Sequence, residues 1–236
     1  LFPFEPDYFK PFGFDAHFIG HPEAFDDFLP AKPAKKSIEE LKIKFNKIIL
    51  LPGSRRSEIS LILPEMLAAT AIIKRHDPNL NFVLPAVPHL LPMIKCLVAG
   101  SGVTILDQPE DLIPALQASD AMIATSGTIT LQAALCGTVG VTCYRTSAFS
   151  GFIGRRLVDL DKVILPNAIL GRPLYPFYFQ EAANGKTLAA ATLDCLYDAN
   201  AKSSAEQAAI ELKSLLTGGA QSFDELVISA LKNWLD

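Results

Sequence analysis

The sequence predicts an α/β fold, in which a parallel sheet has helices on both faces and is followed by C-terminal helices. Short apolar segments, bounded by Gly, Pro or polar residues, alternate with longer segments of helical pattern. The apolar segments are hydrophobic on both faces, which is typical of a buried parallel sheet with right-handed crossovers. Of the 236 residues, 50% are hydrophobic and 19% are charged, so the chain can form a sizeable core.

The regular pattern begins at Ser37, after a proline- and aromatic-rich stretch that favours a connecting segment. After Leu165 it gives way to turns rich in proline and aromatic residues. The predicted strands are 47–51, 81–84, 103–106, 121–124 and 139–143. The predicted helices are 37–44, 59–75, 88–99, 109–118 and 127–136, with further Ala-rich helices at 186–198, 203–216 and 222–235.

Composition excludes several classes of function. The 21 Lys and Arg residues against 25 Asp and Glu give a net charge of −4, which argues against nucleic-acid binding. The four cysteines form no CxxC pair and no ligand spacing with the histidines, so we expect a reduced interior without metal or cofactor. The apolar runs are far shorter than a membrane-spanning helix requires. No GxSxG or HExxH motif supports a hydrolase or a metalloenzyme.

The start of the chain, LFPFE, has neither the basic start nor the apolar centre of a secretion signal. We interpret the start at Leu1 as an internal cut in a longer protein. Residues 18–22 (FIGHP) resemble a hinge, in which His21 is either a loop residue or a functional one. The other histidines, His17, His76 and His89, are assigned to the surface or the core.

The strongest local feature is the turn at 50–58 (LLPGSRRSE), where the first strand ends and a long helix begins. Gly53 permits close backbone approach, the N–H groups at Ser54 and beyond point outward from the helix start, and Arg55 offers donors that match phosphate oxygens. These features predict an anion site. A capped turn with solvated arginines is an equal alternative, and the turn does not match the GxxxxGK[ST] loop.

A second strand-to-helix turn contains Ser126, Gly127 and Thr128, whose hydroxyl and N–H groups are also suited to a phosphate, although Ser and Thr are ordinary helix caps. Both turns follow strands of one parallel sheet, so they lie on the same edge and can face one diphosphate. Gln132 lies one helical turn beyond Thr128, where its amide can reach a sugar hydroxyl. A surface glutamine is the alternative.

Further candidates lie at the end of the sheet and after it. Tyr144 and Arg145 end the last predicted strand and add a basic group near the edge, or form a salt bridge at the rim. Asn167, Gln180 and Glu181 lie in the irregular region, where loops often complete a cleft. The alternatives are a turn at Asn167 and a favourable charge at a helix start for Glu181.

With these motifs, in this order, the chain resembles the lipid-A-disaccharide synthases, a glycosyltransferase family of the GT-B type with two Rossmann-like halves. The resemblance covers roughly residues 1–181. The predicted C-terminal helices resemble the family only in their helical character. The matching motifs are FIGHP at 18–22, LLPGSR at 50–55, SGT at 126–128, YR at 144–145, LPN at 165–167, GR at 171–172 and QE at 180–181.

The resemblance implies transfer of 2,3-diacylglucosamine from UDP-2,3-diacylglucosamine to 2,3-diacylglucosamine 1-phosphate, with release of UDP. It divides the chain into a remnant of the N-terminal half (1–36), a UDP-sugar-binding Rossmann-like domain (37–181) and a C-terminal helical segment (182–236). It assigns catalysis to Arg55 and Asn167. It assigns UDP-sugar binding to Gly53, Ser54, Ser126, Gly127, Thr128, Gln132, Tyr144, Arg145, Gln180 and Glu181.

The family has Glu where this chain has Gln132, so the resemblance implies altered donor affinity. It also implies that the other half supplies the general base and the site of the lipid X-type acceptor. The protein would be cytoplasmic, peripherally bound to the inner membrane, and a homodimer is compatible with the family. The alternatives are a UDP-sugar-binding module without turnover and a UDP-sugar epimerase.

Overall fold

The computed structural model describes residues 2–26, 46–146 and 163–235. The predicted helix at 37–44 lies outside these ranges. Within them the predicted α/β fold is confirmed: six parallel strands form one sheet in the order β3-β2-β1-β4-β5-β6. The strands are β1 (Lys47–Leu51), β2 (Asn81–Pro85), β3 (Thr104–Leu106), β4 (Ala121–Thr125), β5 (Gly140–Tyr144) and β6 (Phe177–Phe179).

This strand order is that of a Rossmann fold, in which the chain reverses its direction of travel across the sheet between β1 and β4. The register places β1 between its two neighbours, so that Ile48 pairs with Phe82 of β2 and with Ala121 of β4. Ligands of such sheets bind beyond the carboxyl ends of the strands at this switch point. The carboxyl ends of β1 and β4 are followed by the two turns that the sequence analysis selected.

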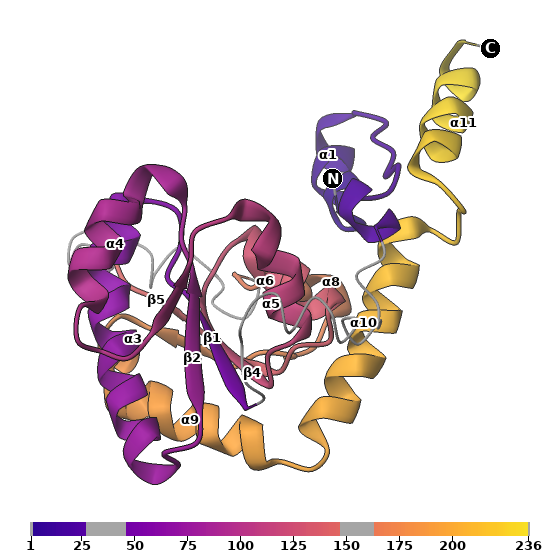
Figure 1. Cartoon of the computed structure of the whole chain (residues 1–236). Coiled ribbons are helices and arrows are strands. Elements are labelled where there is room, and N and C mark those ends of the chain that lie inside the picture. The colour runs from indigo at the N-terminus through magenta and orange to yellow at the C-terminus, as the bar shows by residue number, and fades with distance from the viewer. Residues whose placement is uncertain (1, 27–45, 147–162, 236) are drawn as a thin grey trace.

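Helices cover both faces of the sheet. Side chains alternate along each strand, so Ile48 and Leu50 face one hydrophobic cluster and Ile49 and Leu51 face another. The first cluster packs against α3 (Arg56–His76), α4 (Leu91–Val98) and α9 (Gly185–Tyr197). The second packs against α5 (Leu112–Gln117), α6 (Thr128–Leu135), α8 (Leu165–Leu170) and α10 (Ala201–Thr217), and Figure 1 shows these helices around the central strands.

The predicted elements from β1 to β5 agree with the structure to within a few residues. α8 and β6 lie after Leu165, where the sequence predicts only turns, so the prediction is wrong for these two elements. β6 has only three residues, lies at the edge of the sheet and follows Pro176, so it offers no hydrophobic alternation to detect. Short 3-10 helices follow three of the strands. They are η3 (Pro88–Leu90) after β2, η4 (Pro109–Asp111) after β3 and η6 (Gln180–Ala182) after β6.

The N-terminal segment lies against the C-terminal helices, beside the far end of α10 (Figure 1). It contains α1 (Glu5–Phe9), η1 (Lys10–Phe12) and η2 (Pro22–Phe25), and α11 (Phe223–Leu235) follows α10. The backbone N–H of His21 donates to the carbonyl of Leu216 at 2.9 Å, and Ala24 is buried with Leu212 and Leu216. α10 therefore fixes the position of η2. No helix in the described ranges has the length and apolar character needed to cross a membrane.

Candidate functional site

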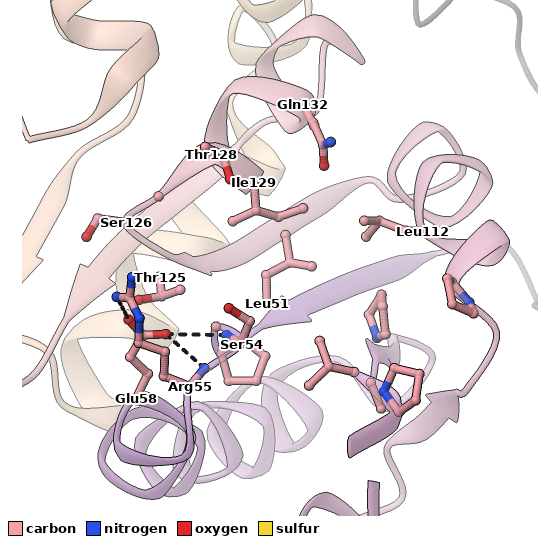
Figure 2. Close-up of a pocket in the computed structure, with 18 of the residues that line it drawn as sticks. Leu51, Ser54, Arg55, Glu58, Leu112, Thr125, Ser126, Thr128, Ile129 and Gln132 are labelled. Atoms are coloured by element: carbon pink, nitrogen blue, oxygen red, sulfur yellow. Dashed lines mark hydrogen bonds and ion pairs between the residues drawn. The ribbon is translucent and has the colours of Figure 1, made fainter. Parts of the chain in front are cut away.

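A cavity of about 510 Å³ lies at the switch point of the sheet, a volume within the range of small-molecule sites. As the sequence predicts, the turns after β1 and β4 both line it (Figure 2). Residues 85–88 and Gln108, Pro109 and Leu112 form another wall. Of the predicted site residues, the cavity is lined by Gly53, Ser54, Arg55, Ser126, Gly127, Thr128 and Gln132.

The turn after β1 is occupied by a carboxylate of the chain itself. Glu58 Oε2 accepts from the backbone N–H groups of Ser54 and Arg55, each at 3.3 Å, and Arg55 Nη1 donates to Glu58 Oε1 at 2.8 Å. Figure 2 shows these contacts as dashed lines. The Glu58 side chain is 8% exposed, whereas that of Arg55 is 76% exposed. The amide groups that the sequence assigned to a phosphate therefore hold an internal anion.

Gly53 is required by this arrangement. Its φ of +98° is one that other residues rarely adopt, and a Cβ at this position would lie 2.5 Å from Glu58 Oε2. From the sequence, we expect the absence of a side chain at Gly53 to let a ligand approach the backbone. In the structure, it lets the Glu58 carboxylate approach. The signal was present, because Glu58 is three residues beyond the N-cap Arg55, the spacing of a capping box.

In the turn after β4, no carboxylate of the described residues accepts from the backbone amides. α6 begins after Gly127 without a side chain bonded to its first amide groups. The hydroxyl of Thr125 is buried and has no hydrogen-bond partner among the described residues. Ser126 donates its own N–H to the carbonyl of Cys143 at 3.2 Å, which holds the turn against β5. This turn can accept an anion from outside, because helix N-termini present unpaired N–H groups and a positive dipole end.

Gln132 lies on α6 at the margin of the cavity. Its Nε2 donates to Glu23 Oε1 at 3.0 Å, a contact between residues 109 positions apart. Sequence reasoning did not select Glu23, and no local signal pointed to it. The second oxygen of Glu23 and Nδ1 of His21 are buried without partners among the described residues. Burial lowers the pKa of His21, although the nearby Glu23 acts in the opposite direction.

Arg145 does not line the cavity. Its Nη1 forms an ion pair with Glu65 of α3, and its Nε donates to the carbonyl of Gln180 at 3.2 Å. The rim salt bridge weighed in the sequence analysis is therefore present. Tyr144 is half-buried at the end of β5 and packs against the first hydrophobic cluster.

Asn167 is buried and makes three hydrogen bonds to the turn before β6. Its Oδ1 accepts from the N–H groups of Leu174 and Tyr175 at 2.9 and 3.0 Å, and its Nδ2 donates to the carbonyl of Tyr175 at 2.9 Å. These bonds hold residues 174–175 in place. Its predicted part in catalysis stays a prediction.

Gln180 and Glu181 lie after β6 and do not line the cavity either. Gln180 is buried with a φ of +54°, and its Oε1 accepts from the N–H of Thr146 at 3.3 Å. Glu181 is exposed at the surface of η6, and its carbonyl accepts from Asn184 Nδ2. Their predicted role in donor binding stays a prediction.

Two cysteines, Cys136 and Cys143, are largely buried in the domain that forms the cavity. Burial raises the pKa of Cys136 and of Cys143 to about 12, so both thiols are protonated at neutral pH. Among the described residues, no group of three or more His, Cys, Asp and Glu side chains is arranged to hold a metal ion. The groups that line the cavity can supply hydrogen bonds and electrostatic stabilisation.

Comparison with solved structures shows the fold. A putative UDP-N-acetylglucosamine 2-epimerase from Listeria monocytogenes aligns with a TM-score of 0.55 at 16% identity, over 92% of this chain and 52% of that one. HepE from Anabaena, solved with UDP and glucose, aligns with a TM-score of 0.53 at 14% identity, over 94% and 56%. The chain thus has the fold of one half of a two-lobed GT-B protein, as the sequence predicts.

Comparison of sequences shows the family. A lipid-A-disaccharide synthase from Paraburkholderia xenovorans is 38% identical over 242 residues, which cover 98% of this chain. The chain spans 61% of the length of that relative. The family model of the lipid-A-disaccharide synthetases matches residues 1–230. With nearly the whole chain matched, and with the two predicted turns meeting at one cavity, this protein belongs to the lipid-A-disaccharide synthetase family.

Proposed function

We propose that this chain binds the nucleotide-sugar donor in a transfer of 2,3-diacylglucosamine from UDP-2,3-diacylglucosamine to 2,3-diacylglucosamine 1-phosphate, with release of UDP. One observation carries the proposal: two turns rich in N–H groups, at neighbouring strand ends, line a single cavity. The family membership supplies the reaction. It also favours the transferase over the epimerase, which the fold alone does not separate.

The diphosphate of the donor would bind between the two turns. The start of α6 offers the amide groups of Gly127 and Thr128, which have no hydrogen-bond partner among the described residues, and the hydroxyls of Ser126 and Thr128. The buried hydroxyl of Thr125 is likewise without a partner there. Arg55 is exposed and bonded only to Glu58 among the described residues, so its guanidinium can turn toward a phosphate. Donors placed in advance stabilise the charge that develops on the departing UDP, which is the main catalytic contribution that we assign to Arg55.

The nucleoside would lie farther along the cavity. Val87, Pro109 and Leu112 offer an apolar wall for the base, and Ile129 lies on the opposite side in α6. Gln132 is one helical turn, or about 6 Å along the axis, beyond Thr128, which is suitable for a ribose hydroxyl when Thr128 contacts the phosphate. The UDP bound by HepE, which shares this fold, supports a uridine nucleotide here.

The remaining predicted residues would act from outside the cavity. Arg145, Gln180 and Thr146 form one network at the end of β5, and a sugar or phosphate that extends past Ser126 would approach Tyr144 and this network. Glu181 follows Gln180 in η6. Asn167 would act by holding residues 174–175, which lead into β6.

The acceptor and the membrane belong to the same proposal. We propose that the lipid X-type acceptor and the general base lie in a part of the enzyme outside this chain. The full enzyme would bind peripherally to the cytoplasmic face of the inner membrane and could act as a homodimer. The exposed aromatic side chains Phe9 and Phe12, at 47% and 76% exposure, are suited either to that surface or to contact with another part of the enzyme.

Calorimetric titration of the 236-residue chain with UDP, ADP, CDP and GDP tests the donor site. We expect UDP to bind with the highest affinity. Arg55→Ala and Ser126→Ala should each weaken UDP binding about tenfold, because each removes a charge-assisted or direct hydrogen bond to phosphate. Arg56→Ala is the matched control, since Arg56 is exposed in the same turn but does not line the cavity.

Two activity assays separate the alternatives. We expect no disaccharide from the 236-residue chain given donor and acceptor, and no epimerised sugar from a free UDP-sugar. Binding without turnover in both assays agrees with the donor-binding part. Rapid disaccharide formation would refute the separate acceptor site, and epimerisation would refute the transferase proposal.

A further inference from the structure

The contact between Glu23 and Gln132 determines what Gln132 presents to the cavity. An ionised carboxylate has only acceptors, whereas a glutamine amide has two donors on nitrogen and an acceptor on oxygen. Glu23 Oε1 therefore requires the NH₂ group of Gln132, and the 3.0 Å bond joins Oε1 and Nε2. The carbonyl oxygen of Gln132 is then directed the other way. Figure 2 shows this oxygen turned toward the ring of residues that line the cavity.

Glu23 is held by parts of the fold that do not belong to the cavity. It lies on η2, which is fixed to α10 by the bond from His21 N–H to the Leu216 carbonyl and by the burial of Ala24. Glu23 itself does not line the cavity. Its second oxygen is buried without a partner among the described residues, so the bond to Gln132 is the one that the structure shows for this carboxylate.

A negative charge at the NH₂ end of an amide polarises it and makes its carbonyl oxygen a better acceptor. Without Glu23, the Gln132 amide could turn over and present donors as readily as an acceptor. With Glu23 in place, position 132 presents an acceptor to the cavity. That acceptor suits a ligand hydroxyl and disfavours a ligand group that has acceptors only.

We propose that Glu23 is a positioning residue that orients the Gln132 amide, so that its carbonyl oxygen accepts a hydrogen bond from a ribose hydroxyl of the bound nucleotide. This inference rests on the proposed function, because it takes the ligand to be a nucleoside diphosphate. It adds Glu23 to the donor site as a residue that selects for the hydroxyl without touching the ligand.

The test compares UDP with 2′-deoxy-UDP and 3′-deoxy-UDP by calorimetric titration of the 236-residue chain. The wild-type chain should prefer UDP over one deoxy analogue by about fivefold to tenfold, the effect of one hydrogen bond. Glu23→Gln should reduce that ratio to about twofold or less, because the amide introduced on η2 can pair with Gln132 in either orientation. The affinity for the analogue itself should stay unchanged.

Two further variants control for simple structural damage. Asp26→Asn removes an exposed carboxylate from the end of the same segment and should leave the ratio unchanged. The exchange Glu23→Gln with Gln132→Glu places the carboxylate on α6 and the amide on η2. It should restore the preference for UDP, because the carboxylate on α6 accepts from both the amide on η2 and the ribose hydroxyl.

The outcomes are distinct. Loss of the ratio in Glu23→Gln and its return in the exchanged pair support the inference. An unchanged ratio in Glu23→Gln, or a wild-type chain that binds UDP and both deoxy analogues equally, overturns the inference and leaves the proposed function standing. A wild-type chain that does not bind UDP at all overturns both.

Discussion

The turns after β1 and β4 begin at equivalent places in the sheet and end in different electrostatic states. In the first, Glu58 occupies the amide groups of Ser54 and Arg55 and pairs with the guanidinium. In the second, the start of α6 has no side-chain cap and the Thr125 hydroxyl lacks a partner among the described residues. The first turn is satisfied without a ligand, and the second is not.

Because of this difference, the two turns should contribute unequally to the affinity for a diphosphate. A ligand at the second turn gains hydrogen bonds with groups that have no competing partner. At the first turn it must compete with Glu58 for the amides, so the net gain there is smaller. Among the backbone amides, those at the start of α6 should therefore contribute most to anion affinity, and the guanidinium of Arg55 adds a separate contribution that depends on the charge of the ligand. The same alternation of strand and helix thus produces two different turns. The turn after β1 is capped by Glu58, and the turn after β4 is open to a ligand.

Gly53→Ala should have the largest effect, because it disrupts the turn after β1 that Glu58 caps. The added Cβ forces Glu58 from its position, and the backbone is strained at positive φ. We expect the free energy of unfolding to fall by about 2 kcal/mol, measured by chemical denaturation. Ser54→Ala is the control, since it keeps the N–H group and should change stability by less than about 0.5 kcal/mol. Equal stability of the two variants would contradict the role of Gly53.

Glu58→Ala tests the competition directly. It removes the carboxylate that satisfies two backbone donors, so the free energy of unfolding should fall by about 1–2 kcal/mol. UDP binding should become tighter by a few fold, because the amides and Arg55 are released. Glu211→Ala on α10 breaks an ion pair with Arg172 that does not line the cavity, and it should leave UDP affinity unchanged. Weaker UDP binding in Glu58→Ala would show that Glu58 supports the ligand and does not compete with it.

Thr125→Val tests whether the turn after β4 binds the ligand. Valine has nearly the same shape and removes a buried hydroxyl without a partner among the described residues, so the unliganded chain should be stabilised by up to about 1 kcal/mol. UDP binding should weaken about fivefold if the ligand is the missing partner. Thermal unfolding with and without UDP measures both effects. A variant that loses stability would show that the hydroxyl has a partner in solution.

The smallest effect should come from pH. Burial lowers the pKa of His21, so the unfolded chain takes up this proton at a higher pH, near 6.5, than the folded chain does. His21 therefore contributes stability above that pH, and the contribution is lost as the pH falls below it. Denaturation between pH 7.5 and 5.5 should show a smaller decrease in stability for His21→Phe than for the wild-type chain.

The sequence predicted the fold and the location of the cavity well. Residues 48–51 and 121–124 are continuous apolar runs, and each is followed by a Gly-containing turn and a helical pattern, so strand, turn and helix were all local signals. The edge strand β6 was missed because three aromatic residues after a proline carry no periodicity. Arg145 was placed near the right edge, but its partner Glu65 lies 80 positions away.

The sequence by itself determined the alternation of strands and helices and the two amide-rich turns, because hydrophobic periodicity and turn chemistry act over a few residues. Only the tertiary structure decided which of those amides are available, that Asn167 ties down the turn before β6, and that Glu23 meets Gln132. These last contacts depend on how η2 packs on α10 and α10 on α6. No local pattern encodes a bond between residues 109 positions apart.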